Sequence, residues 1–313
     1  MFSYKKYYYL LPIIIYCIIF FLLLLLINKN ISNCNRNFNI KEFFSKKVKR
    51  IQFKDFWGDL NPKNNFFTEL LTRYMHKFEI VDNNPDIIIF SVFGNYQNIN
   101  KNIKSIFFTG ENHRVKKNVN LNLTFDNTSR YNNIRLPLWI LYGYDENMIL
   151  SKKHTNKFCC FVYSNNVDFR NNFCKKLSEY KQVDCGGNCL NNIGRKVENK
   201  LEFQKNYKFC IAYENSIQPG YTTEKILEAY KSNCIPIYCG SNTISDDFNP
   251  ETFINAPDFK NENDLINYIK KVDTDEKLYE TYFNKPIYSK KWLDIFNDPE
   301  EIFFKNIAEK IIS

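Results

Sequence analysis

Three apolar runs of the chain are followed by polar or charged side chains, at the points where the runs would end as strands. The first, Ile106–Phe108, continues through a glycine to Glu111 and Asn112. Open α/β sheets bind ligands beyond the carboxyl ends of their strands. Glu111 is therefore a candidate general base, which would take a proton from an attacking hydroxyl group. Considered alone, a carboxylate in such a place is more often an ordinary surface residue of a loop.

The second run, Lys208–Tyr213, leads to a segment that resembles an anion site at the start of a helix. Free backbone N–H groups and the positive end of a helix dipole favour a phosphate there, and Thr222 or Thr223 is expected to cap the helix. The plain alternative is a capped helix with a surface Glu–Lys pair. The candidate residues of this segment are Glu214, Asn215, Ser216, Tyr221, Glu224 and Lys225.

The third run, Phe158–Tyr163, passes through Ser164 and Asn165 into a predicted helix with Arg170 near its start. If the second and third segments are neighbours, Arg170 and Lys225 point to the same crevice. Two cations suit a diphosphate group, because each can form charge-assisted hydrogen bonds to its oxygens.

Several familiar site patterns do not occur in the sequence. It contains neither the G-x-G-x-x-G motif of dinucleotide-binding proteins nor a P-loop. The D-x-D pattern Asp273–Asp275 follows an amphipathic helical segment, so we expect a solvated turn there and no metal site. The cysteines show no zinc-type spacing.

The elements that must position these residues alternate between strands and helices. Phe158–Tyr163, a helix through Tyr180 and a strand at Val183 predict one βαβ unit. Lys208–Tyr213, a helix over Thr223–Ser232 and a strand at Ile235–Tyr238 predict a second. The sequence therefore indicates an α/β fold with a Rossmann-like half. Further strands are expected at Arg50–Phe53, Asp86–Phe93 and Ile103–Thr109, and further helices at Leu265–Val272 and within Trp292–Ile312.

The first part of the chain carries a predicted membrane anchor. Residues 10–27 hold no charge and, at about 1.5 Å per helical residue, are long enough to cross most of a bilayer. Lys5 and Lys6 precede this span, which favours a cytoplasmic tail and a translocated body. A luminal body would meet oxidising conditions, so some of the ten cysteines are candidates for pairing. Sequons at Asn30, Asn122 and Asn127 agree weakly with that location.

The formal net charge of +9 alone would suit nucleic acid, an anionic membrane surface or an anionic small substrate. The Lys and Arg residues are spread along the whole chain, and no nucleic-acid-binding motif or aromatic-basic stripe occurs. We therefore expect no nucleic-acid partner.

Six segments together resemble the alpha-1,3-fucosyltransferases of glycosyltransferase family 10. Residues 209–216, 220–226 and 235–240 are similar to the donor-binding signature of that family. Residues 107–112 resemble its acceptor-side motif, and Arg130–Tyr131 with residues 135–138 its next segment. Ser164–Asn165 through Arg170 to residues 183–187 resembles the entry to its donor domain.

The resemblance implies a GT-B architecture, in which two Rossmann-like domains face a central cleft. It also implies an inverting transfer of L-fucose from GDP-fucose that requires no metal or other cofactor. Glu111 would be the general base and Arg170 and Lys225 would hold the diphosphate. The resemblance further implies that Asn215, Tyr221 and Glu224 bind the nucleotide and its ribose. Secondary candidates for the site are Asn112, Ser164, Asn165, Glu214 and Ser216.

The expected partners are GDP-fucose and a glycan on a glycoprotein, a glycolipid or a free oligosaccharide, with N-acetylglucosamine as the family's habitual acceptor. The expected location is a Golgi or other secretory-pathway membrane, in type II orientation. Two alternatives stay open: a GT-B transferase with another nucleotide sugar, and a tethered glycan-binding protein without turnover. The predicted organisation is a tail (1–9), an anchor (10–27), a stem (28–47), an acceptor-side domain (48–150), a donor domain (151–290) and a helical tail packing across both domains (291–313).

Overall fold

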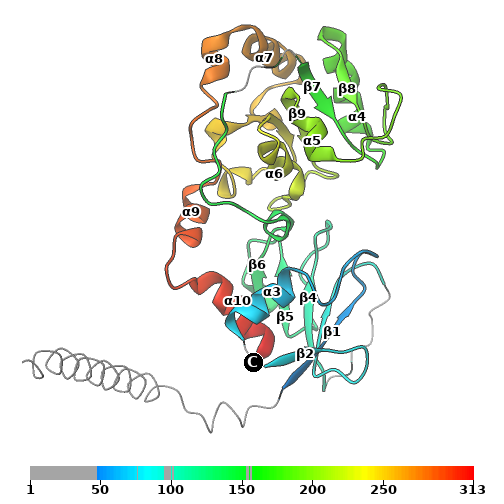
Figure 1. The fold of residues 1–313 in the computed structure, drawn as a ribbon, viewed down its shortest axis with the longest axis vertical. Helices are drawn as coiled ribbons and strands as arrows, with labels where there is room; N and C mark the ends of the chain where they lie inside the picture. Colours follow the sequence, from blue (N-terminus) through cyan, green and yellow to red (C-terminus); the bar gives the residue numbers. More distant parts are fainter. Residues whose placement is uncertain (1–47, 76, 95–99, 101, 153–154, 156) are drawn as a thin grey trace, which may run out of the picture. The chain divides into compact units, whose positions relative to one another are not determined.

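The computed structural model describes residues 48–75, 77–94, 100, 102–152, 155 and 157–313. The predicted tail, anchor and stem lie outside these residues. In the described part of the chain, no helix is both long and apolar enough to cross a bilayer. Residues Lys49–Ser313 form one compact unit with two parallel sheets, which Figure 1 shows as separate groups of strands.

The first sheet has six parallel strands in the order β2-β1-β3-β4-β5-β6. Its centre is formed by β3 and β4, whose side chains are almost all buried. The strands are β1 (Lys49–Lys54), β2 (Phe78–Ile80), β3 (Ile87–Phe90), β4 (Lys104–Phe108), β5 (Leu121–Thr124) and β6 (Asn133–Arg135). All six strands are parallel, so their carboxyl ends share one edge, where Glu111 follows β4.

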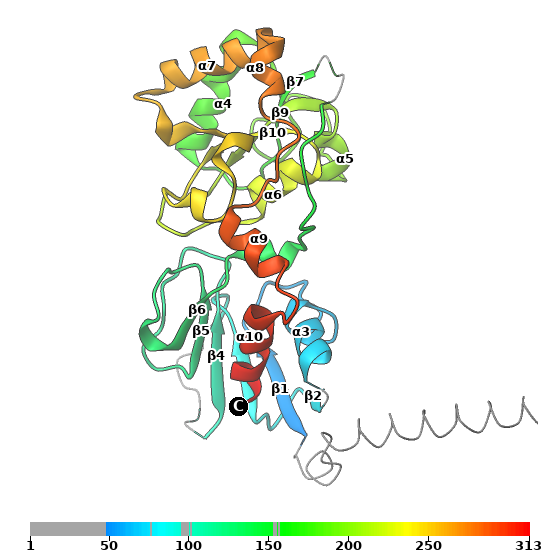
Figure 2. The ribbon, with the colours of Figure 1, turned by 90° about the vertical axis from the view of Figure 1, so that its left-hand side faces the viewer.

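Two helices from opposite ends of the described chain pack together beside this sheet. Helix α3 (Phe66–Tyr74) begins at Asn65, whose side chain accepts hydrogen bonds from the Phe67 and Thr68 N–H groups. Helix α10 (Ile302–Ile312) lies next to α3 in both ribbon views (Figures 1 and 2). Lys104 of β4 donates to the Lys310 carbonyl at 2.6 Å. Phe304, Ile307 and Ile311 of α10 are buried, so this helix contributes to the hydrophobic core beside the first sheet.

The second sheet has five parallel strands in the order β11-β10-β9-β7-β8. The two predicted βαβ units are confirmed as β7-α4-β8 and β9-α6-β10. The elements are β7 (Lys157–Phe161), α4 (Asp168–Tyr180), β8 (Val183–Cys185), α5 (Lys200–Gln204), β9 (Tyr207–Tyr213), α6 (Glu224–Lys231), β10 (Ile235–Cys239) and β11 (Ile254–Asn255). The remaining helices are α7 (Glu262–Thr274), α8 (Glu276–Glu280) and α9 (Lys290–Phe296), and the short 3₁₀ helices are η2 (Arg130–Asn132), η3 (Leu138–Tyr142), η4 (Ile244–Asp246), η5 (Pro250–Thr252) and η6 (Ala256–Asp258).

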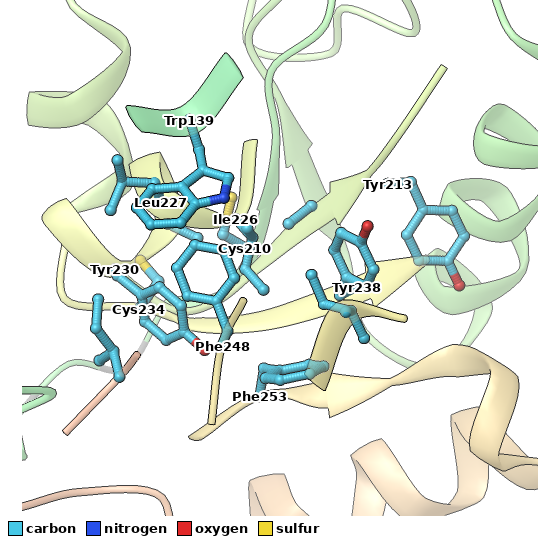
Figure 3. Close-up of a cluster of buried hydrophobic side chains, with 14 of the residues drawn as sticks. Trp139, Cys210, Tyr213, Ile226, Leu227, Tyr230, Cys234, Tyr238, Phe248 and Phe253 are labelled. Carbon is cyan, nitrogen blue, oxygen red and sulfur yellow. The ribbon is translucent and has the colours of Figure 1, made fainter. Parts of the chain in front are cut away.

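Aromatic side chains join the two halves through η3. The Trp139 ring lies 5.0 Å from Phe248 and 5.1 Å from Trp292, measured between centroids. Figure 3 shows Trp139 and Phe248 beside Leu227 and Tyr230 of α6. All of these side chains are buried, so the connection between the halves is itself a hydrophobic core. The predicted domain boundary near residue 150 stays a prediction.

Two polar residues lie in surroundings that the sequence did not indicate. Asp273 belongs to α7, and its side chain is 3% exposed and paired with Lys181 and Lys208. The expected solvated turn is therefore wrong at Asp273, although Asp275 does cap α8. Asn122 lies in β5 and is fully buried, with its side-chain amide donating to the carbonyls of Lys116 and Tyr131. Its sequon therefore gives no support for a luminal location.

The eight described cysteines are all buried. The Sγ atoms of Cys174 and Cys185 lie 3.6 Å apart, a hydrogen-bonding separation. No disulfide occurs among the described residues, so the expected pairing is not found there. Cys17 and Cys34 lie outside them.

Candidate active site

A cavity of about 540 Å³ collects side chains from both halves of the molecule. Most of the predicted site residues line it, although they come from five separate segments of the chain. These are Glu111, Ser164, Asn165, Arg170, Asn215, Tyr221, Glu224 and Lys225. Asn112, Glu214 and Ser216 are not among the residues that line it.

Glu111 stands on a tightly packed turn after β4. The Thr109 hydroxyl accepts from the Glu111 N–H at 3.0 Å and donates to the Glu111 carbonyl at 3.0 Å. Gly110 is buried, and a Cβ atom there would lie 2.7 Å from a methyl group of Leu138. The backbone around Glu111 is therefore held in place, while its half-buried carboxylate borders the cavity.

Arg170 is fixed in place from several sides although it borders the cavity. Its Nη1 atom donates to Asn215 Oδ1 at 2.9 Å, and its Nη2 atom donates to the Asn165 carbonyl at 2.6 Å. The guanidinium carbon lies 3.7 Å from the centroid of the Tyr163 ring, a cation–π contact. Burial lowers the pKa of Arg170. Its Nε atom is buried and has no hydrogen-bond partner among the described residues.

Lys225 lies in a compact cluster of charges at the start of α6. Its ammonium group is 3.1 Å from Glu224, 3.3 Å from Glu214 and 2.8 Å from the Thr223 hydroxyl. Burial alone would lower the pKa of Lys225, but the charges of Glu214 and Glu224 outweigh it and raise the pKa. Burial likewise opposes ionisation of Glu224, and Lys225 and Lys200 hold the pKa of Glu224 below its ordinary value. Both groups are therefore charged at neutral pH.

Glu214 belongs to this cluster but does not line the cavity. It is fully buried, and its carboxylate accepts from the Thr223 N–H at 2.8 Å and from the Thr223 hydroxyl at 2.6 Å. Full burial raises the pKa of Glu214, while Lys225 and Thr223 oppose this effect. Glu214 is placed to position Lys225 and does not reach the cavity itself.

Three backbone N–H groups at and before the N-cap of α6 are already hydrogen-bonded. The Gly220 N–H donates to Ser241 Oγ at 2.8 Å, and the N–H groups of Tyr221 and Thr223 donate to Gln218 and Glu214. Thr223 occupies the N-cap position, but its side chain makes no capping hydrogen bond. These three N–H groups are therefore not free for an anion, and the predicted cap by the Thr223 side chain does not form.

The loop at Gly220 contacts residues of the first half. Gly220 has a φ of +78°, and a Cβ atom there would lie 2.3 Å from the Phe125 carbonyl oxygen. The Gly220 carbonyl accepts from Arg135, which also forms a two-pronged ion pair with Asp247 at 2.6 and 2.7 Å. This loop is consequently part of the contact that joins the halves.

The sequence reasoning missed several residues that line the cavity. Trp57, Asp59, Phe93 and Tyr142 come from the first half, and Lys196 and Lys200 follow β8. Phe93 and Tyr142 are 53% and 48% exposed, unusually high values for large apolar side chains. The sequence analysis placed Phe93 inside the expected strand Asp86–Phe93, whereas β3 ends at Phe90, so Phe93 was not recognised as a residue that follows a strand. In the described residues, no cluster of three or more His, Cys, Asp or Glu side chains could hold a metal ion.

Two protein-family models match the chain in succession. The model "Alpha-(1,3)-fucosyltransferase FucT N-terminal domain" matches residues 51–142, and "Glycosyltransferase family 10 (fucosyltransferase) C-term" matches residues 151–295. The chain belongs to glycosyltransferase family 10. Glu111 and the cavity-lining residues Trp57 to Tyr142 fall within the first match, and Arg170 to Lys225 within the second.

Relatives and solved structures agree with this family. "Alpha-(1,3)-fucosyltransferase FucT" of Helicobacter pylori is 30% identical over 318 residues, spanning 84% of this chain and 64% of its own length. The "4-galactosyl-N-acetylglucosaminide 3-alpha-L-fucosyltransferase 9" of Mus musculus is 27% identical over 191 residues, spanning 58% of this chain and 51% of its own. The chain thus covers less than two thirds of these two relatives.

A crystal structure of an alpha1,3-fucosyltransferase with GDP-fucose is similar over 85% of this chain and 92% of that one, with 28% identity and a TM-score of 0.67. A structure of an alpha1,3-fucosyltransferase with GDP matches to the same TM-score. The α/β fold with two parallel sheets is therefore the GT-B-like fold of these fucosyltransferases.

Proposed function

We propose that this chain transfers L-fucose from GDP-fucose to a glycan acceptor, with formation of an alpha-1,3 linkage. The observation that carries the proposal is one cavity that holds two cations, Arg170 and Lys225, together with the carboxylate of Glu111. The similarity to an alpha-1,3-fucosyltransferase of Helicobacter pylori, and to a crystal structure of an alpha1,3-fucosyltransferase with GDP-fucose, supports the donor and the linkage. No single half of the molecule supplies this set of residues.

The mechanism that fits these residues is an inverting displacement. Glu111 takes the proton of the acceptor hydroxyl while its oxygen attacks the anomeric carbon of fucose. The bond from that carbon to the diphosphate oxygen breaks, and GDP leaves with the electron pair. Arg170 and Lys225 stabilise the negative charge that develops on the diphosphate, and their existing hydrogen bonds keep them in place before the reaction.

The remaining parts of the proposal concern substrate and setting. Asn215, Tyr221 and Glu224 contact the nucleotide and its ribose, with Ser164 and Asn165 beside them. N-acetylglucosamine within a larger glycan is the proposed acceptor, and no metal ion or other cofactor is required. Residues 10–27 anchor the chain in a Golgi or related membrane, with the catalytic part on the luminal side.

Release of GDP by the full chain tests the proposed donor. GDP-fucose and other nucleotide sugars would be offered with a mixed panel of glycans, with and without EDTA. We expect acceptor-dependent GDP release from GDP-fucose that EDTA does not change. Release from another donor alone would refute the proposed substrate, and loss of release in EDTA would refute the metal-independent mechanism.

A further inference from the structure

Three aromatic side chains of the first half line the cavity beside Glu111. Trp57 follows β1 and Phe93 follows β3, while Tyr142 ends η3. Strands β1, β3 and β4 are consecutive neighbours in the sheet, so Trp57, Phe93 and Glu111 extend from adjacent carboxyl ends. An acceptor whose hydroxyl group reaches Glu111 must therefore extend over the neighbouring aromatic residues.

The structure fixes the Trp57 ring and the backbones of Phe93 and Tyr142. Trp57 is braced from behind by Phe56, with ring centroids 5.5 Å apart and nearly perpendicular rings. The Phe93 N–H donates to the Asp55 carbonyl at 2.9 Å. Lys231 of α6 donates to the Tyr142 carbonyl at 2.5 Å, which ties Tyr142 to the second half. Their backbones are thus anchored, while about half of the Phe93 and Tyr142 side chains stays exposed.

The side chains of the first half that line the cavity favour a particular kind of ligand. An exposed ring in a cavity gains free energy when an apolar surface covers it, and the C–H face of a sugar ring is such a surface. Among the described residues of the first half that line the cavity, the charged ones are Asp59 and Glu111, and none is a Lys or Arg. Carboxylates accept hydrogen bonds from hydroxyl groups but repel anionic groups.

Resting on the proposed function, we propose that Trp57, Phe93 and Tyr142 form an acceptor platform. The platform binds the apolar face of a neutral, hydroxyl-rich sugar ring and orients its reacting hydroxyl group towards Glu111. The three residues act as specificity determinants for the acceptor and take no part in proton transfer.

The test separates a flat ring from mere apolar character at position 93. Phe93→Leu keeps an apolar side chain without a flat face, whereas Phe93→Tyr keeps the face. Binding of methyl N-acetyllactosaminide to the full chain saturated with GDP would be measured by calorimetry, and the acceptor KM would be measured with GDP-fucose. We expect Phe93→Leu to weaken binding and raise the KM by about tenfold, and Phe93→Tyr to retain both values.

Tyr131→Leu is the matched control, because Tyr131 is 40% exposed in the same half and does not line the cavity. It should leave both values unchanged, and GDP affinity should be equal in all variants. Equal sugar affinity in Phe93→Leu and the wild type would overturn the platform, as would equal losses in the Leu and Tyr variants. Sugar binding that depends on the Phe93 ring without any transfer from GDP-fucose would support the platform while refuting the proposed function.

Discussion

At the scale of single residues, the site depends on how its two cations are held. Arg170 is fixed by Asn215, the Asn165 backbone and the Tyr163 ring. Lys225 is fixed by Glu214 and Glu224, which reduce the net charge of the cluster but hold the Lys225 ammonium group at one place. Such preorganisation lowers the reorganisation needed when charge develops on a leaving group.

Replacement of Lys225 tests whether this ammonium group binds the diphosphate. Lys225→Met should weaken GDP binding in calorimetry by about tenfold or more, because a charge-assisted hydrogen bond is lost. Lys176→Met removes the same charge from an exposed position on α4 and should leave GDP affinity unchanged. Equal affinities in these two variants would contradict the diphosphate role of Lys225.

The sequence predicted the members of this site better than their contacts. The residues that follow strands β4, β7 and β9 were found because parallel strands place their carboxyl ends together. The support of Lys225 by Glu214 was not visible, because a buried carboxylate after a strand has the same sequence pattern as an exposed one. Phe93 and Tyr142 were missed because exposed aromatic side chains resemble core residues in sequence.

At the scale of elements, Asp273 ties α7 to its neighbours in the second half. Its carboxylate accepts from Lys208 of β9 and from Tyr180 and Lys181 at the end of α4. Burial disfavours the charged form, but the bonds from Lys208 and Lys181 outweigh it and lower the pKa of Asp273. A lowered pKa in the folded state means that ionised Asp273 stabilises the fold.

This stabilisation should depend on pH in a defined direction. It is fully present above the ordinary aspartate pKa of about 4 and is lost as the pH falls through the lower pKa of the folded state. Asp273→Asn should therefore lower the urea midpoint at pH 7, and its difference from the wild type should shrink below about pH 4. Asp294→Asn, in an exposed pair with Lys290, should change little at either pH. A constant difference for Asp273→Asn across pH would contradict the ionic role.

The elements that the sequence predicted are those with long apolar runs or clear helical periods. β7, β9, β10, α4 and α6 were found for this reason. β2 is a three-residue, half-buried strand, and β5 contains the buried polar residues Asn122 and Thr124, so neither shows a strand pattern. Helix α3 was missed, although its start at Asn65 carries a capping-box pattern.

At the scale of the whole molecule, the cavity needs both halves in register. Arg135 of β6 and Asp247 after η4 form the ion pair that joins them, and Trp292 of α9 donates to the same carboxylate at 2.9 Å. The Arg135 and Asp247 side chains are 9% and 0% exposed. A buried pair of this kind contributes little by itself, but removal of one partner leaves an uncompensated charge.

Arg135→Met should therefore cost about 3–5 kcal/mol of folding free energy. Urea unfolding followed by tryptophan fluorescence would measure it, since Trp139 and Trp292 lie at this junction. Addition of Asp247→Asn should restore part of the loss, because the buried negative charge is then gone. An effect of Arg135→Met no larger than that of Lys290→Met, at the exposed pair with Asp294, would contradict this account.

The central claim is that Glu111 removes the acceptor proton in a cavity that holds GDP-fucose through other residues. The most direct measurement compares the full chain with its Glu111→Gln variant, in fucose transfer to an N-acetyllactosamine acceptor and in GDP titration. The glutamine keeps the size of the side chain but cannot accept the proton. The account predicts that transfer falls by about a hundredfold or more while GDP affinity stays nearly unchanged. Full transfer by Glu111→Gln would contradict it.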